Sequence, residues 1–420
     1  MRVLMISLPI EAHFNTMVPL AWGLQAAGHD VHVASKPRLT DHVTAAGLTA
    51  VPMGSRDEHT QLLDRLGTDL VNFYASVDFT GMRDESADKV LSDNDVLVGT
   101  FYALENDASF IHELAGYADH WVPELIIWEQ FTFAGAVVGA ATNIPHGRLV
   151  WSPDLFYQMR QKVSVALADR LPWLRDDALR DWLESAVGAF GREFGDDLLF
   201  GQWQIELSPP ELRLPSPRPS LPIRYVPYNG VSVVEDWVRE PPKLPRVALT
   251  MGITARSGHY ANPVDIKEVL RKLAELDIEV VATLSQAEQA EIGPLPDRVR
   301  LVDFVPLRAL LPTCDGIIHH GGSGTWASAL AAGVPQIVIS NLWDNVYRGR
   351  QLAELGAGVF LPPAEATPET IQNKLISLMT ADGFQTAARR LQESMLGQPA
   401  PTDIVPQLEE IATSPGYVLR

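Results

Sequence analysis

The sequence has a single cysteine, Cys314, among its 420 residues. One thiol cannot form an internal disulfide, which excludes a disulfide-stabilised secreted scaffold and suits a reducing compartment. No apolar run reaches the roughly 18 residues that suggest a membrane-spanning helix. The opening, MRVLMISLPIEAH, lacks the basic region, apolar run and cleavage site of a signal peptide. We therefore expect a cytoplasmic protein without a membrane span.

Positive charge is also scarce. The chain has 33 Lys and Arg against 52 Asp and Glu, a formal net charge of −19. Such a balance argues against nucleic acid and anionic membranes as partners. An anionic substrate would meet a repulsive overall field, so any site that binds one must act locally.

Several functional motifs are missing as well. The main glycine-rich stretch, HHGGSGT, contains neither GxxxxGK[ST] nor GxGxxG, so it is neither a P-loop nor a dinucleotide fingerprint. There is no DxD-type motif in a suitable loop and no His/Cys cluster with metal-ligand spacing. We therefore expect no metal site and no bound cofactor.

The most informative stretch runs from Val305 to Gly358. It combines, in order, an apolar strand Gly316–His319, a glycine loop His320–Thr325, a small-residue helix to Ala332, a second apolar strand Pro335–Ser340, and the polar residues Trp343, Asp344 and Asn345. A glycine loop that leads into a helix lets a ligand approach the backbone and offers unpaired N–H groups, which favours a phosphate or diphosphate.

The side chains around this loop predict what the phosphate belongs to. His320 at the loop mouth can donate to a phosphate oxygen, and Asp344 and Asn345 can bond the hydroxyls of an attached group. The pattern indicates a nucleotide sugar. Strand alternation points His319 the other way, so we interpret it as structural.

Strands and helices alternate twice along the chain, which predicts an α/β fold of two doubly wound domains. A proline-rich stretch, Leu207–Pro245, separates the two series and is too stiff for long helices. We place an N-terminal domain at 1–215, a linker at 216–240, a C-terminal domain at 241–400 and a final helix in 401–420. The strand ends of both domains should face a common cleft.

Two segments of the N-terminal half bear on the cleft. A loop, Pro9–Thr16, follows the first strand and contains His13, Phe14 and Asn15. The segment from Ser55 to about Ser92 loses the alternation and is rich in charge. We interpret it as a solvated surface loop, with a mobile cover over the acceptor site or a docking site for a partner as the alternative.

The HHGGSGT loop, the preceding VPLRALLPTCDGIIHH and the following Trp-Asp-Asn resemble the donor signature of nucleotide-sugar glycosyltransferases of the two-domain GT-B fold. More narrowly, the chain resembles the antibiotic glycosyltransferases that attach deoxysugars to polyketide aglycones. The stretches 1–54, 124–154 and 201–237 extend the resemblance to well over half the chain.

The resemblance assigns roles to individual residues. His13 matches the position of the family's catalytic base, and Glu129 stands where the family usually has an orienting Asp. It also implies that the N-terminal domain holds the acceptor, that the C-terminal domain holds the donor, and that the last helix crosses back onto the first domain. The predicted acceptor contacts are Phe14, Asn15 and Phe131, and the predicted donor contacts are Gly252, Val305, Leu307, His320, Gly321, Gly322, Ser323, Gly324, Thr325, Trp343, Asp344 and Asn345.

We thus expect an inverting, metal-independent transferase that moves a deoxysugar, or an amino sugar, from a dTDP-sugar to a hydroxyl of a macrolide-like or anthracycline-like aglycone. The resemblance also implies an auxiliary protein similar to a cytochrome P450 without its haem-binding cysteine, and a homodimer stays open. Two alternatives remain, a nucleotide-sugar epimerase of similar build and a non-catalytic partner that binds nucleotide sugar.

Overall fold

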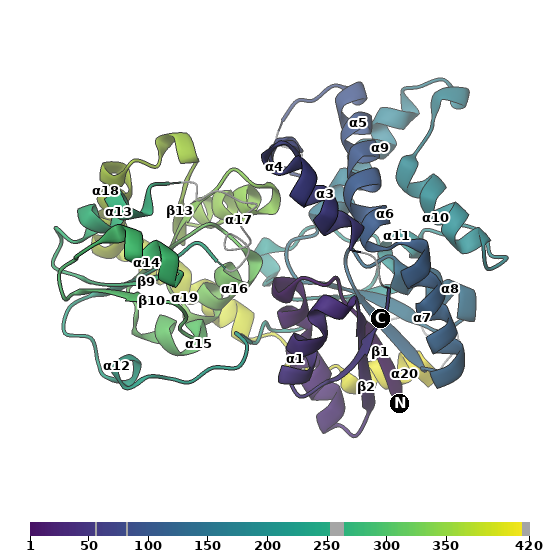
Figure 1. The fold of residues 1–420 in the computed structure, drawn as a ribbon, viewed down its shortest axis with the longest axis horizontal. Helices are drawn as coiled ribbons and strands as arrows, with labels where there is room; N and C mark the ends of the chain where they lie inside the picture. Colours follow the sequence, from purple (N-terminus) through teal and green to yellow (C-terminus); the bar gives the residue numbers. More distant parts are fainter. Residues whose placement is uncertain (55–56, 81–82, 253–263, 414–420) are drawn as a thin grey trace.

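The computed structural model describes residues 1–54, 57–80, 83–252 and 264–413, and only the backbone of Trp343. Within these residues, two sheets form the centres of two lobes that lie side by side (Figure 1). Every strand pairing in both sheets is parallel. The predicted class, two doubly wound α/β domains, is confirmed.

The first sheet has the strand order β3-β2-β1-β4-β5-β6-β7. Its strands are β1 Arg2–Ile6, β2 Asp30–Ser35, β3 Thr49–Pro52, β4 Leu125–Glu129, β5 His146–Val150, β6 Trp203–Glu206 and β7 Ser220–Pro222. The order reverses between β1 and β4, and ligands of such sheets bind where the strand order reverses, outside the carboxyl ends. The chain following β1 and the last residue of β4, Glu129, therefore meet at one point.

The helices of the first domain cover both faces of this sheet. They are α1 Glu11–Ala26, α2 Thr40–Ala45, α3 Glu58–Leu66, α4 Thr68–Ser76, α5 Ala87–Leu97, α6 Ala103–Glu105, α7 Ala108–Trp121, α8 Ala134–Thr142, α9 Leu155–Ala168, α10 Ala178–Gly188 and α11 Asp197–Phe200. The predicted loop Pro9–Thr16 was wrong: α1 begins at Glu11, so His13 stands in its first turn. No capping side chain marks this start, because Ile10 occupies the N-cap position.

The segment 55–92 was also interpreted wrongly as a loop. Its described part forms α3, α4 and the beginning of α5, and Gly67, with a φ of 48°, separates the first two helices. Its polar composition is explained by one exposed face, while His59 and Tyr74 turn inward. Helix α4 packs against α17, so this segment contacts the other domain.

The second sheet has the order β10-β9-β8-β11-β12-β13. Its strands are β8 Arg246–Thr250, β9 Glu279–Thr283, β10 Val299–Val302, β11 Gly316–His319, β12 Gln336–Ile339 and β13 Gly358–Leu361. The helices in and around this domain are α12 Asp236–Arg239, α13 Ile266–Leu273, α14 Gln286–Ile292, α15 Leu307–Leu310, α16 Ser323–Ala332, α17 Trp343–Glu354, α18 Pro368–Thr380 and α19 Asp382–Leu396. Here the order reverses between β8 and β11, which brings the loops after these two strands together.

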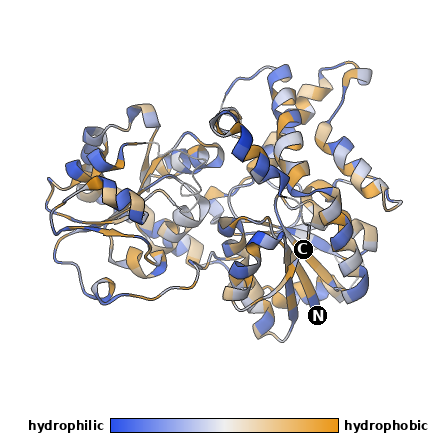
Figure 2. Cartoon of the chain, in the orientation of Figure 1, coloured by the Kyte–Doolittle hydropathy of each residue, from blue (hydrophilic) through white to orange (hydrophobic). Residues whose placement is uncertain are grey.

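The connections between the domains differ from the predicted linker. Strand β7 pairs with β6, so the first sheet continues into the residues placed in the linker, 216–240. After α19 the chain returns to the first domain, where the last helix, α20 Val405–Thr413, packs near β4 (Figure 1). Apolar residues concentrate in the strands and on the inward faces of the helices (Figure 2). Among the described helices, we find none with the length and apolar character that a membrane crossing needs.

Candidate active site

Two adjoining cavities lie between the domains. The first has a volume of about 250 Å³ and is lined by residues of both domains, among them His13, Phe131 and Asp344. The second, of about 140 Å³, lies over the loops of the C-terminal domain. His320, Gly322 and Ser323 line both cavities. A ligand at these three residues would therefore extend into the first cavity on one side and into the second on the other.

His13 and Glu129 form a hydrogen-bonded pair in the wall of the first cavity. The His13 Nδ1 atom lies 3.0 Å from Oε1 of Glu129. Glu129 is fully buried, whereas the His13 side chain is 15% exposed. With Nδ1–H donating to the carboxylate, the other ring nitrogen, Nε2, stays available as a proton acceptor.

The Glu129 carboxylate is itself held by several donors. Trp151 Nε1 donates to Oε1 at 2.9 Å, and Thr132 Oγ1 donates to Oε2 at 3.0 Å. The indole of Trp151 also lies beside the His13 ring, with 4.7 Å between the ring centres. Sequence reasoning missed Trp151, which follows β5 directly and so ends at the same sheet edge as Glu129.

The glycine loop leads into α16 as predicted. Gly322 is the N-cap of this helix and supplies no side-chain cap, which leaves the first N–H groups open toward the cavities. The His320 ring packs between two glycines: a Cβ added to Gly252 would lie 2.2 Å from the ring, and one added to Gly322 would lie 2.5 Å from it. Burial lowers the pKa of His320 to about 4, with a further lowering by Arg348, so the ring is neutral at pH 7.

His319 has the structural role that strand alternation predicted. It is fully buried, its Nδ1 accepts from the Gly321 N–H at 3.0 Å, and its Nε2 bonds Gln336 Oε1 at 2.9 Å. Both ring nitrogens are thus engaged in holding the loop. Burial lowers the pKa of His319 to about 3.

Residues at the start of α17 face the same cavity. Asp344 lines it and forms an ion pair with Arg348. Asn345 also lines the first cavity, and its Nδ2 donates to the His320 carbonyl at 3.0 Å and to Ser340 Oγ at 3.3 Å. Its amide thus braces the loop, and the predicted hydroxyl contact stays a prediction. Trp343 begins the helix, and its side chain lies outside the described part of the structure.

The remaining predicted donor residues gather around the second cavity. Gly252, Val305, Leu307, Gly324 and Thr325 line it together with Ser323. Gly321 lines neither cavity; its φ of 90° turns the loop beneath them. Tyr225 and Tyr228, in the predicted linker, also line the second cavity, and sequence reasoning did not identify them.

Two of the three predicted acceptor residues lie elsewhere. Phe14 is 1% exposed and packs in the core behind α1, so an acceptor contact is not supported. Asn15 lines the second cavity and not the first. Both corrections follow from the early start of α1, because a helix turns successive side chains by about 100°, which points Phe14 and Asn15 away from the first cavity that His13 lines.

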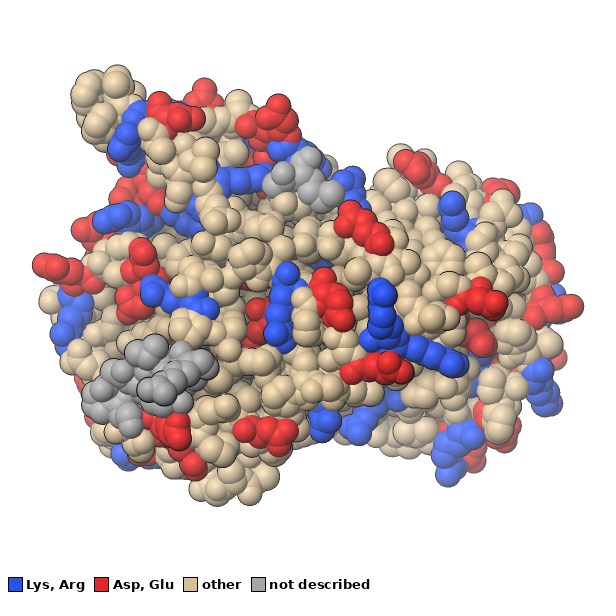
Figure 3. All heavy atoms as spheres, turned by 180° about the vertical axis from the view of Figure 1, so that it is seen from behind, with Lys and Arg blue, Asp and Glu red and all other residues tan. Residues whose placement is uncertain are grey.

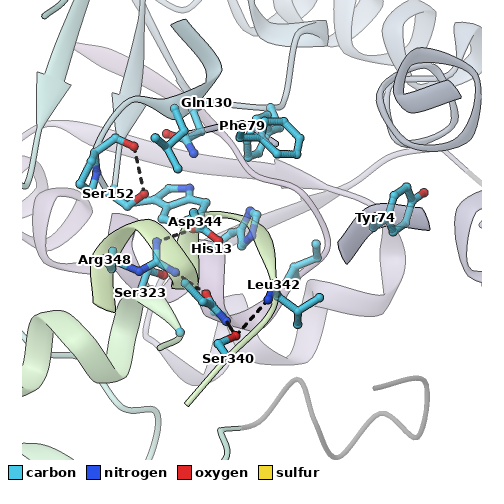
Figure 4. Close-up of a pocket in the computed structure, with 18 of the residues that line it drawn as sticks. His13, Tyr74, Phe79, Gln130, Ser152, Ser323, Ser340, Leu342, Asp344 and Arg348 are labelled. Carbon is cyan, nitrogen blue, oxygen red and sulfur yellow. Dashed lines mark hydrogen bonds and ion pairs between the residues drawn. The ribbon is translucent and has the colours of Figure 1, made fainter. Parts of the chain in front are cut away.

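Aromatic side chains form most of the far wall of the first cavity. Phe131 lies there as predicted, and the others are His59, Tyr74, Phe79, Phe101, Trp151 and Phe156. Figure 4 shows His13, Ser323, Asp344 and Arg348 around the cavity, with Tyr74 apart from them at one end. The wall suits a large apolar ligand with few polar groups. Among the described residues, no cluster of three or more His, Cys, Asp or Glu is arranged to hold a metal ion.

Family models match the chain in two adjacent parts. The N-terminal domain of erythromycin biosynthesis protein CIII-like proteins matches residues 22–252, and the C-terminal domain matches residues 267–411. The chain belongs to the erythromycin biosynthesis protein CIII-like family.

Named relatives match this CIII-like protein over nearly its whole length. It is 43% identical to the 10-deoxymethynolide desosaminyltransferase of Streptomyces venezuelae, over 98% of this chain and 97% of that one. It is equally 43% identical to the aklavinone 7-beta-L-rhodosaminyltransferase of Streptomyces galilaeus, with 98% and 96% covered. Among solved structures, glycosyltransferase VinC in complex with dTDP matches with a TM-score of 0.87 at 36% identity, covering 98% of this chain and 99% of that one. The CIII-like protein is therefore a glycosyltransferase, and it has the GT-B fold.

Proposed function

We propose that the CIII-like protein transfers a deoxysugar, or an amino sugar, from a dTDP-sugar to a hydroxyl of a polyketide aglycone, with inversion at the anomeric carbon. The observation that supports this most directly is the shared cavity. The His13–Glu129 pair stands in one wall, and the open N-terminus of α16 with His320 stands in another.

Each wall supplies one half of the chemistry. Nε2 of His13 would take the proton of the acceptor hydroxyl as its oxygen attacks the anomeric carbon. The bond from that carbon to the diphosphate breaks, and the α16 N–H groups with His320 stabilise the leaving charge. Attack opposite the leaving group inverts the configuration in one displacement.

The two cavities correspond to two parts of the reactants. The second cavity would take the nucleoside, because it joins the first at the phosphate-binding residues. The relatives are named for desosaminyl and rhodosaminyl transfer, and their names mention 10-deoxymethynolide and aklavinone. The aromatic wall of the first cavity fits an aglycone of that kind. These names favour transfer over epimerisation and over non-catalytic binding.

The finer partners are also part of this proposal. We expect an auxiliary protein similar to a cytochrome P450 without its haem-binding cysteine, a location in the cytoplasm, and no bound cofactor besides the dTDP-sugar. A homodimer is compatible with these expectations.

The test is an incubation with dTDP-desosamine or dTDP-rhodosamine and either 10-deoxymethynolide or aklavinone, with and without the auxiliary protein. We expect a glycoside and dTDP in equal amounts, with an inverted anomeric centre by NMR. Conversion of the donor to an isomeric sugar nucleotide without acceptor would show an epimerase. Donor binding without any turnover would instead indicate a non-catalytic partner.

A further inference from the structure

Arg348 is a buried cation beneath the phosphate-binding loop. Its side chain is 1% exposed, although it belongs to α17, a helix that starts at the rim of the first cavity. Nε donates to the Gly321 carbonyl at 2.9 Å, and Nη2 donates to Asn345 Oδ1 at 2.6 Å. Nη1 forms the ion pair with Asp344. One guanidinium thus joins the glycine loop to the beginning of α17.

Few charged side chains line the two cavities. Among the described residues, Arg348 is the only Lys or Arg that lines either cavity, and Asp344 is the only acidic residue that lines the first. Asp344 shares that cavity with His320, Gly322 and Ser323, where a diphosphate would lie. An unpaired carboxylate there would repel the donor in a chain whose net charge is already −19.

The charges of Arg348 and Asp344 both affect the pKa of His320. Burial is the largest cause of the lowered pKa of His320; the charge of Arg348 lowers this pKa further, and the charge of Asp344 raises it. The two side chains therefore act on His320 in opposite directions.

We propose that Arg348 is a positioning residue for the donor: it neutralises Asp344 and anchors the Gly321 carbonyl, so that the diphosphate meets a neutral, fixed wall. This inference rests on the proposed function in that the donor is a dTDP-sugar. The planar guanidinium suits the task, because its fork bonds three groups in one plane and keeps its charge when buried. If Arg348 were removed, the Asp344 carboxylate would stay in the cavity wall without a compensating positive charge.

The experiment is calorimetry of the full chain with dTDP and with thymidine, which has no phosphate. Arg348→Met should weaken dTDP about tenfold or more, because Asp344 then faces the diphosphate uncompensated. Thymidine affinity should not change. Asp344→Asn should tighten dTDP, and the double variant should return to within about threefold of wild type. Arg350→Met, an exposed arginine of the same helix, is the matched control and should behave as wild type.

Each other result has a definite meaning. Wild-type dTDP affinity in Arg348→Met would overturn the proposal, and so would a double variant as weak as Arg348→Met, because charge would then not be the cause. Equal losses for dTDP and thymidine would overturn it by showing damage to the fold. If Arg348→Met does not fold, Asp344→Asn decides alone: unchanged or weaker dTDP binding contradicts the proposal. A wild-type chain that binds no dTDP would instead refute the proposed donor.

Discussion

Glu129 shows what a single side chain can determine in this site. It accepts hydrogen bonds from His13, Trp151 and Thr132 while fully buried, so its carboxylate has little freedom to move. The sequence predicted the pair but could not predict its geometry, because a glutamate is one methylene longer than the family's usual aspartate. The structure shows a hydrogen bond of ordinary length despite the extra methylene.

The first prediction concerns His13. His13→Ala should lower the rate of transfer by roughly 10²–10⁴-fold, the usual contribution of general-base catalysis. Glu129→Gln should cause a smaller loss, since it disturbs the orientation of the base and leaves the base in place. Affinity for dTDP should barely change in either variant, because the phosphate-binding loop belongs to the other domain. Single-turnover transfer at saturating donor, beside dTDP calorimetry, measures both quantities.

Two results would contradict this assignment. One is a His13→Ala enzyme that retains the wild-type rate. The other is a variant that fails only because dTDP no longer binds, which would give His13 a role in donor binding or folding.

The second prediction concerns His320. Removing its hydrogen bond to a charged phosphate in His320→Ala should weaken dTDP by about 1.5–3 kcal/mol. Because the pKa of His320 is lowered to about 4, the ring is neutral throughout pH 6–8 and the loss should be the same at both ends of this range. A ring with an ordinary pKa would gain charge toward pH 6, and the loss would grow there. Calorimetry at the two pH values separates these outcomes, and an unchanged affinity would remove His320 from the site.

At the scale of elements, the strands were predictable, whereas the start of α1 was not. Buried parallel strands such as β4 and β11 are continuous apolar runs, which a sequence displays directly. Helix α1 has no capping side chain, so nothing local marks its start at Glu11. Helix α4 packs against α17 of the other domain, which no local pattern reveals.

The burial of Arg348 was also not predicted from the sequence. An arginine inside a polar helix is usually exposed, and its burial here depends on Asp344, Asn345 and the Gly321 carbonyl together. The sequence placed three of these residues at one site but could not show that they bond one another. Which side chain faces which cavity depends on helix rotation, and that explains the corrections at Phe14 and Asn15.

The third prediction concerns α16. Its uncapped first turn offers N–H groups to the leaving diphosphate, and His320 adds a neutral donor beside them. These groups can take the charge role that a divalent cation has in other transferases. Transfer should therefore survive an excess of EDTA, measured as glycoside formed per minute. A loss of activity that Mg²⁺ or Mn²⁺ restores would show that the helix end alone is not sufficient.

At the scale of the whole molecule, Figure 3 shows acidic and basic side chains interspersed on the face that it presents. The general arrangement followed from the sequence, because a stiff, proline-rich connection between two doubly wound domains favours strand ends that face each other. Segment 55–92 contributes His59, Tyr74 and Phe79 to the aromatic wall. The sequence offered a cover over the acceptor site only as an alternative for this segment, because its polar composition is equally typical of a surface loop.

The return of the chain to the first domain has a consequence for biosynthesis. The core around β1 and β4 includes Ile404, Val405, Leu408 and Ile411, and Glu409 lies 3.1 Å from His29. On the ribosome these residues are made long after the strands that they cover. The C-terminal sheet, continuous in sequence, can finish folding while the N-terminal one still exposes an apolar strip. The C-terminal half can thus be complete first, and the half that contains His13 closes only with α20.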